Sequence, residues 1–274
     1  MRLMACLSAL ILAANLGAAE LSPKVLRLIG PDTLTVRGTD VELFQNSALS
    51  EIFRVPLDWD AATGVRQVIG IENRTADGSR WLAVLVGASA IPAGEAEDGT
   101  AFQALDANTA VHGDPQSVQE ASLRWKADEP PGEIAAKVRR LALSYDNWFL
   151  MVKPLDKPLM EFLGGPGAPA LKYRNEAIQA IEEASGGIRF GALNEFHAEA
   201  LLKAPEDAAA VATLARWVPG FVQLQEPWSV PSRLADIAGD LSIRAEGRSV
   251  SISFTLPERE MRELLKTPGR LPAE

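Results

Sequence analysis

One stretch of the chain places an imidazole between two carboxylates. Glu195, His197 and Glu199 alternate along the sequence, and residues two apart point to the same face of a β-strand. Such a row could bind a divalent metal or transfer protons. However, side chains on one straight strand diverge, whereas a metal site needs ligands that converge. We therefore predict a solvent-exposed row that Arg189 can pair with, and no metal site. The opposite face would carry Phe196, Ala198, Ala200 and Leu202.

The other histidine, His112, lies two residues before Asp114. A Ser–His–Asp site would need a serine on a strained elbow, and the sequence Gly-Ala-Ser-Ala-Ile around Ser89 lacks the final glycine of that pattern. Asp114 followed by Pro115 is instead typical of a helix N-cap and a first-turn proline. We predict that Asp114 caps a helix and that His112 is not catalytic.

Three further segments could hold a ligand. The loop with Glu95, Glu97 and Asp98 lacks the ligand spacing of an EF-hand, so we expect it to be solvated. Trp59 between two aspartates could contact a cation or a sugar, but a lone ring more often packs under a loop. The Gly/Pro stretch at 164–169 lacks the Lys-Ser/Thr of a phosphate loop and is expected to be a hinge. No cofactor is predicted.

The first 19 residues have the layout of a secretory signal peptide. Arg2 supplies a positive charge, residues 3–16 are almost entirely apolar, and small residues end at Ala19. The apolar run is shorter than the roughly 20 residues of a membrane span. We predict cleavage after Ala19 and a periplasmic or extracellular protein without stable membrane insertion.

Cleavage would leave an acidic chain without cysteine. The only cysteine is Cys6, and the full chain has 27 Lys+Arg against 36 Asp+Glu, a net charge of -9. Without Arg2 the balance is 26 against 36, or -10. The absence of thiols excludes disulfides, thiolate metal sites and a cysteine nucleophile. The negative charge disfavours nucleic acid as a partner.

The 274 residues are 47% hydrophobic, which is enough for one large domain or two small ones. Alternating β-rich and amphipathic segments predict an α+β fold of antiparallel sheets with helices packed on one face. Hairpins are expected to pair 65–73 with 80–87, 102–105 with 109–112, 187–191 with 195–203 and 240–245 with 249–254. Helices are expected after Val41, Asp114, Pro130 and Pro205, and after a capping box formed by Thr255 and Glu258.

The pattern also predicts two related βαββ-type halves, residues 20–144 and 145–274, the second a possible repeat of the first. The matching residues are Leu34, Val36, Asp40, Leu43 and Phe44 with Leu150, Val152, Asp156, Leu159 and Met160, and Ile69 and Ile71 with Ile188 and Phe190.

The segment Leu-Asp-Ala-Asn-Thr-Ala-Val-His-Gly-Asp-Pro at 105–115 resembles exported bacterial proteins of unknown function built from repeated α+β units. In these proteins a hairpin ending in Gly-Asp leads into a helix. The resemblance lies mainly in residues 100–126, and it implies a secreted scaffold without indicating catalytic residues.

Together these features predict an exported, non-enzymatic binding or scaffold protein. Its sheet faces, or a groove between the halves, would bind a protein or another envelope component. One alternative is a hydrolase or metal-dependent enzyme using His112, His197 or the acidic loop at 95–98. Another is a small-ligand carrier, which would need a closed apolar cavity between the halves.

Overall fold

A computed structural model describes residues 20–51, 64–87, 94–95, 99–152, 179–224 and 241–266. Several predicted features lie outside these residues: the signal peptide with its cleavage site at Ala19, Trp59, Ser89, the side chains of the acidic loop at 95–98, and the stretch at 164–169.

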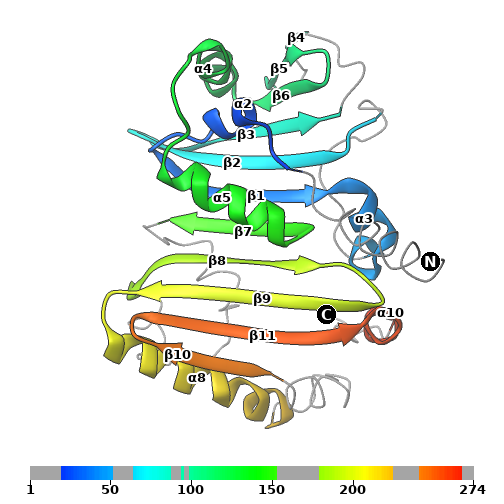
Figure 1. Cartoon of the computed structure of the whole chain (residues 1–274), viewed down its shortest axis with the longest axis vertical. Helices are drawn as coiled ribbons and strands as arrows, with labels where there is room; N and C mark the ends of the chain where they lie inside the picture. The colour runs from blue at the N-terminus through cyan, green and yellow to red at the C-terminus, as the bar shows by residue number, and fades with distance from the viewer. Residues whose placement is uncertain are drawn as a thin grey trace, which may run out of the picture.

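The fold is α+β, as the sequence predicts, and its centre is an eleven-stranded antiparallel sheet (Figure 1). The strand order is β10-β11-β9-β8-β7-β1-β2-β3-β6-β5-β4. The strands are β1 (Thr33–Asp40), β2 (Gln67–Thr75), β3 (Gly78–Val86), β4 (Gly94–Glu95), β5 (Ala101–Asp106), β6 (Thr109–Gly113), β7 (Asn147–Val152), β8 (Ile181–Arg189), β9 (Leu193–Leu202), β10 (Ser242–Glu246) and β11 (Ser249–Pro257). The helices are α2 (Pro23–Arg27), α3 (Val41–Asn46), the 3-10 helix η1 (Ala48–Glu51), α4 (Pro115–Lys126), α5 (Glu133–Ser144), α8 (Pro205–Leu224) and α10 (Glu258–Lys266).

The start of α4 confirms the predicted N-cap. An Asp114 carboxylate oxygen accepts hydrogen bonds from the backbone N–H groups of Gln116, at 3.0 Å, and Ser117, at 3.2 Å. Pro115 occupies the first turn, where its missing N–H leaves no bond unmade. This cap fixes where the chain leaves β6, and therefore where α4 lies on the sheet.

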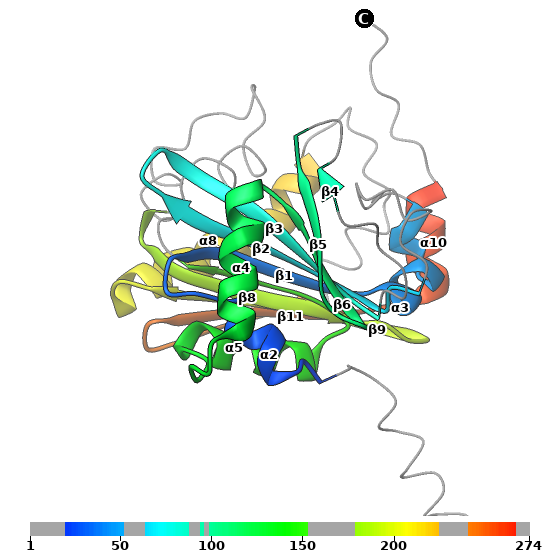
Figure 2. The same ribbon diagram turned by 90° about the horizontal axis from the view of Figure 1, so that it is seen from above.

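The predicted capping box before the last helix is wrong. Thr255 is still within β11, which stays paired with β9 as far as Pro257. The Glu258 carboxylate instead accepts hydrogen bonds from the Ala48 N–H and from the Asn194 side chain, both at 2.8 Å. Figures 1 and 2 place α3 and α10 together at one end of the sheet. Glu258 thus joins two segments that lie far apart in the sequence.

The two halves form one continuous sheet because β1 pairs with β7. The order β1-β2-β3-β6-β5 on one side has the same form as β7-β8-β9-β11-β10 on the other. The register does not support both predicted sequence matches, however. If Val36 matches Val152, then Ile71, the partner of Val36, matches Glu183, the partner of Val152. The duplication therefore stays a prediction.

The main core lies between one face of the sheet and helices α2, α4 and α5, which share that face as expected. Val36, Ile71 and Leu150 on the strands pack in the same cluster as Val118 of α4 and Val138 of α5. Figure 2 shows α2 and α5 on the same side of the strands. We call this helix-covered part, formed by β1, β2, β3, β6 and β7, the covered face.

Helix α8 packs on the opposite face, at the other end of the sheet, so the prediction that the helices pack on one face is wrong for α8. Ala208 and Ala212 of α8 share a buried cluster with Leu202 of β9 and Val250 of β11. Since side chains alternate along a strand, the neighbours of Leu202 and Val250 point away from α8. No helix in the described part of the chain is long and apolar enough to cross a membrane.

Candidate functional site

The predicted row Glu195, His197 and Glu199 lies on the same side of the sheet as the covered face, but beyond its last helix. We call the part of that side formed by β8, β9, β11 and β10 the open face. Figure 1 shows β8, β9 and β11 with no helix in front of them. Glu195 and Glu199 are exposed and His197 is half-buried.

Two rows of paired residues show how the surface changes across the sheet. One row runs Leu82, Ile71, Val36, Leu150, Ser185, Glu199, Ser251 and Arg244. The next runs Val84, Ile69, Gly38, Trp148, Gly187, His197, Ser253 and Ser242. Both rows change from apolar to polar or small residues between β7 and β8. Along these two rows the open face therefore lacks the apolar side chains that would require a cover, whereas Leu193 and Leu201 lie on the same face toward its two ends.

An ion pair marks the border between the two faces. The Lys137 ammonium of α5 lies 2.7 Å from a Glu183 carboxylate oxygen of β8. The hydrogen bond to Glu183 raises the pKa of Lys137, and burial opposes it. This contact holds α5 at the first strand of the open face and keeps the lysine charged.

Tyr145 and His197 stand beside each other on the open face. Their rings are nearly parallel, with an interplanar angle of 7° and centroids 6.2 Å apart. A Cβ on Gly187 would lie 2.5 Å from Tyr145 Cγ, so the glycine lets the ring approach the strand. Burial raises the pKa of Tyr145, Arg189 lowers it, and the carboxylates of Glu199 and Glu195 raise it further. Tyr145 is therefore a hydroxyl donor at neutral pH.

The three residues of the row do not converge. Within the described ranges no group of three or more His, Cys, Asp or Glu side chains is placed to hold a metal ion. What the arrangement offers is a series of separate hydrogen-bonding groups, with serines of β8 and β11 on both sides of the β9 row.

His112 lies on the opposite side of the sheet, in an aromatic cluster. Its ring stacks on Phe102, with centroids 3.8 Å apart, and meets the Trp81 ring edge-on at 5.2 Å. Its Nε2 lies 2.8 Å from the Thr100 hydroxyl oxygen. Asp114 caps α4 instead of orienting this imidazole. The contact with Thr100 follows from the β5–β6 register, which the sequence pattern did not specify.

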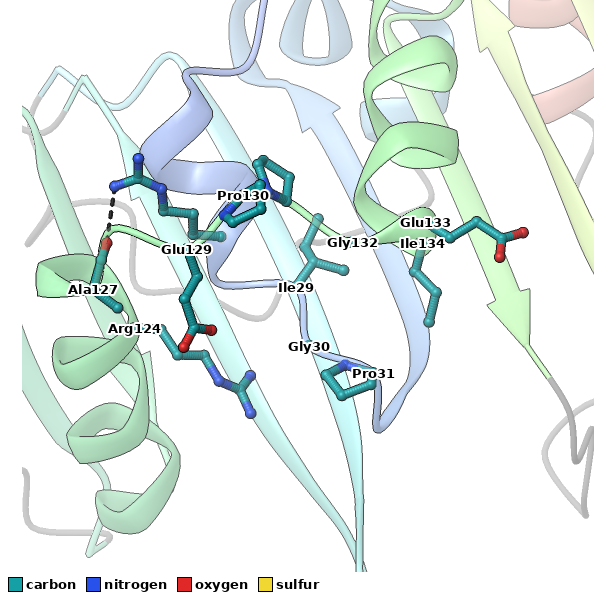
Figure 3. A pocket seen from close by; sticks show the side chains of 12 residues that line it. Ile29, Gly30, Pro31, Arg124, Ala127, Glu129, Pro130, Gly132, Glu133 and Ile134 are labelled. Carbon is teal, nitrogen blue, oxygen red and sulfur yellow. Dashed lines mark hydrogen bonds between the residues drawn. The ribbon is translucent and has the colours of Figure 1, made fainter.

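A surface cavity of about 510 Å³ was not predicted at all. It lies between the turn after α2 and the loop that joins α4 to α5. Figure 3 shows Arg124 on one side, Glu133 and Ile134 on the other, and Ile29, Gly30 and Pro31 between them. All of its lining residues come from the N-terminal half, so it is not the cavity between halves that a small-ligand carrier would need.

Two arginines fix the walls of this cavity. Arg27, at the end of α2, donates to the Ala127 carbonyl at the end of α4, at 3.0 Å (Figure 3). Arg124, in the last turn of α4, donates to the Leu28 carbonyl at the end of α2, at 3.2 Å. The last carbonyls of a helix have no partner within that helix, and the negative end of the helix dipole favours a cation there. Each arginine therefore supplies the missing donor to the end of the other helix. Basic residues in two last turns were the only sequence signal for this site.

Comparison with known proteins shows a fold likeness and nothing closer. No family model matches the chain, and no curated protein matches it. The solved structure of TP0453 in crystal form III superposes with a TM-score of 0.52 at 11% identity, covering 90% of this chain and 99% of that one. Crystal forms I and IV of TP0453 give TM-scores of 0.49 at 10% identity and cover 90% of this chain and 98% and 97% of theirs. The chain is thus similar to TP0453 in fold.

Proposed function

We propose that this chain is an exported, non-catalytic binding protein whose open face binds a polar polymer of the bacterial envelope. The observation that carries the proposal is the change along the two rows of paired residues. One sheet presents a buried apolar surface under helices on one part and, on the next, a polar surface that no described helix covers. The leader sequence supports export.

The composition of the open face favours a glycan over a protein partner. Protein interfaces are depleted in serine and glutamate and take much of their energy from buried aromatic anchors. Half of the paired β9 and β11 residues on this face are of these depleted types: Glu195, Glu199, Ser249, Ser251 and Ser253. The others are His197, Thr255, Leu193, Leu201 and Pro257. Hydroxyls and carboxylates can exchange hydrogen bonds with sugar hydroxyls, and the half-buried Tyr145 ring offers an apolar surface with a polar tip.

Non-catalytic binding fits the geometry of both histidines. His197 lies in a row whose members diverge, and His112 is stacked between aromatic rings with a threonine as its polar neighbour. Asp114, the carboxylate nearest to His112 in the sequence, caps α4, so the Ser–His–Asp arrangement of hydrolytic triads is not built around it.

Co-sedimentation with purified cell-wall glycan tests the proposal. The probe is insoluble peptidoglycan freed of protein, mixed with the chain from Glu20 onward. We expect the protein to pellet with the glycan, and the double variant Glu195→Lys, Glu199→Lys to lose about tenfold in affinity because both side chains stand on the binding surface.

The matched control is Glu42→Lys, Glu206→Lys, which changes the net charge equally at exposed sites in the first turns of α3 and α8. It should bind as the unchanged protein does. Equal loss in both variants would mean general charge attraction, and no pelleting of the unchanged protein would refute the glycan. Binding only to protein-bearing envelope fragments would assign the face to a protein partner instead.

A further inference from the structure

The cavity beside α2 and α4 is separate from the open face, and the Arg124 guanidinium that lines it has N–H donors not used within the described part of the chain. The Arg124 guanidinium carries five N–H donors in a fixed plane. Its Nη1 donates to the Leu28 carbonyl, and no other hydrogen bond or ion pair joins Arg124 to the described part of the chain. The edge formed by Nε and Nη2 can bind a carboxylate through two parallel hydrogen bonds, and no described residue occupies it.

Gly30 makes room for this guanidinium. A Cβ at Gly30 would lie 2.6 Å from Arg124 Nη1, 2.9 Å from Cζ and 3.0 Å from Nη2. These three similar distances mean that the guanidinium lies flat over the glycine. A larger residue would displace the guanidinium, so Gly30 leaves room for the charged group at this position.

Apart from Glu129 and Glu133, the remaining walls are largely apolar, and prolines restrict their backbone. Ile29 is 4% exposed, Ile134 is half-buried, and Pro31, Pro130 and Pro131 restrict the backbone on both sides. Arg27 holds the loop in place through the Ala127 carbonyl. A wall that is already ordered loses little entropy when a ligand binds.

The charges around the cavity limit what the guanidinium can accept. Arg27 and Arg124 are balanced by Glu129 and Glu133 among the lining residues, and both glutamates are exposed. Arg27 is already engaged with Asp128 at 3.1 Å. A single available guanidinium edge near two carboxylates suits a monoanion better than a phosphate dianion.

We propose that this cavity binds an apolar carboxylate of the kind found at the C-terminal residue of a peptide. The carboxylate pairs with the Nε–Nη2 edge of Arg124, and the apolar side chain packs against Ile29, Pro31 and Ile134. This site does not depend on the function proposed for the open face.

Titration with N-acetyl-leucine tests the site, with N-acetyl-leucinamide as the uncharged analogue and acetate as the anion without a side chain. Binding is followed by calorimetry and by chemical shift changes. We expect N-acetyl-leucine to bind about tenfold or more tightly than either analogue, because only it supplies both parts of the ligand. Arg124→Gln should lower its affinity about tenfold, and Arg124→Lys, which keeps the charge but not the fork, should give a smaller loss.

The control is Arg140→Gln, which removes an exposed arginine of α5 and should leave binding unchanged. Gly30→Ala, which keeps Arg124 but moves its guanidinium, should also weaken binding, and it covers the case in which Arg124→Gln fails to fold. Equal binding of acid and amide, full binding by Arg124→Gln, or no saturation at millimolar N-acetyl-leucine would each overturn the proposal.

Discussion

The covered and open faces are parts of one side of one sheet, joined through the β7–β8 pairing. On the covered face, Val36 and Leu150 are fully buried, and α5 lies over them. In the same row on the open face, Ser185 and Glu199 remain in contact with solvent. The strand pairing continues across the border between β7 and β8. The two faces therefore differ in their side chains, which are apolar and need a covering helix on one face and are polar on the other.

This difference shows that strand pairing and helix cover are separate requirements. Antiparallel strands can leave one face in water as long as the other face is buried. For the open face, burial is supplied from behind by α8, through Leu202 and Val250. On the covered face the burial comes from the other side of the sheet, where α2, α4 and α5 pack on the strands.

The largest expected effect comes from emptying the covered face. Leu150→Ala removes a side chain that is 0% exposed, and it should lower the free energy of unfolding by about 3 kcal/mol. Glu199→Ala, two strands away in the same row, should change it by less than about 0.5 kcal/mol. Urea denaturation measures both, and similar losses would remove the distinction between the two faces.

A second test uses the closest contact on the covered face. A Cβ at Gly38 would lie 2.2 Å from Cζ2 of Trp148, whose ring is buried. Gly38→Ala should therefore cost about 2 kcal/mol and alter the near-UV circular dichroism. Gly191→Ala is the control, because this site is exposed and the new Cβ would lie 3.4 Å from the Leu193 carbonyl oxygen. An unchanged spectrum for Gly38→Ala would show that Trp148 moves freely.

A third test removes the contact that Glu258 makes between the two halves at the end of the sheet. Glu258→Ala leaves the Ala48 N–H and the fully buried Asn194 amide without their acceptor, and it should cost about 1.5 kcal/mol. Glu258→Gln keeps one acceptor oxygen and should lose less. Glu260→Ala in the same helix is the control. If Glu258→Ala unfolded at the same temperature as the control, the hydrogen bonds from Ala48 and Asn194 to Glu258 would contribute nothing to stability.

The smallest expected effect is a gain in stability at Asp146, next to the border. Burial raises the pKa of Asp146 above 3.8, the Phe190 N–H opposes this, Asp40 adds to it, and Arg189 lowers it. Because the native pKa is the higher one, stability is lost as the pH rises from 3.8 through the native value. Near neutral pH, Asp146→Asn should raise the free energy of unfolding by less than about 1 kcal/mol, which thermal unfolding measures as a higher melting temperature. The stability of the variant should also depend less on pH. A destabilised variant would show that the charge itself is needed.

Local elements could be predicted from sequence because each has a local cause. The Asp114 cap, the hairpins and the alternation of Ser249 to Phe254 follow from capping, turns and strand periodicity. The joining of β1 to β7 could not be predicted, since pairing between distant strands leaves no pattern within either strand. The last helix was misplaced because Thr255 and Glu258 have the spacing of a capping box, while Glu258 serves Ala48 and Asn194.

The candidate sites divide in the same way. The exposure of Glu195 and Glu199 followed from alternation along one strand, whereas the half-burial of His197 beside Tyr145 depends on a residue from outside that strand. The cavity depends on Arg27 and Arg124 each donating to a carbonyl at the end of the other's helix, almost 100 residues away. No spacing in the sequence encodes such contacts. Nor could the Thr100–His112 contact be foreseen without the hairpin register.

Cysteine labelling tests the role of the open face most directly, because the chain from Glu20 onward contains no cysteine. Ser251→Cys on the open face and Val84→Cys on the covered face are treated, in the folded protein, with a charged maleimide. We expect fast labelling at position 251, slow labelling at position 84, and slower labelling at 251 when peptidoglycan is added. Equal rates at the two positions, or a rate at 251 that glycan leaves unchanged, would contradict this expectation.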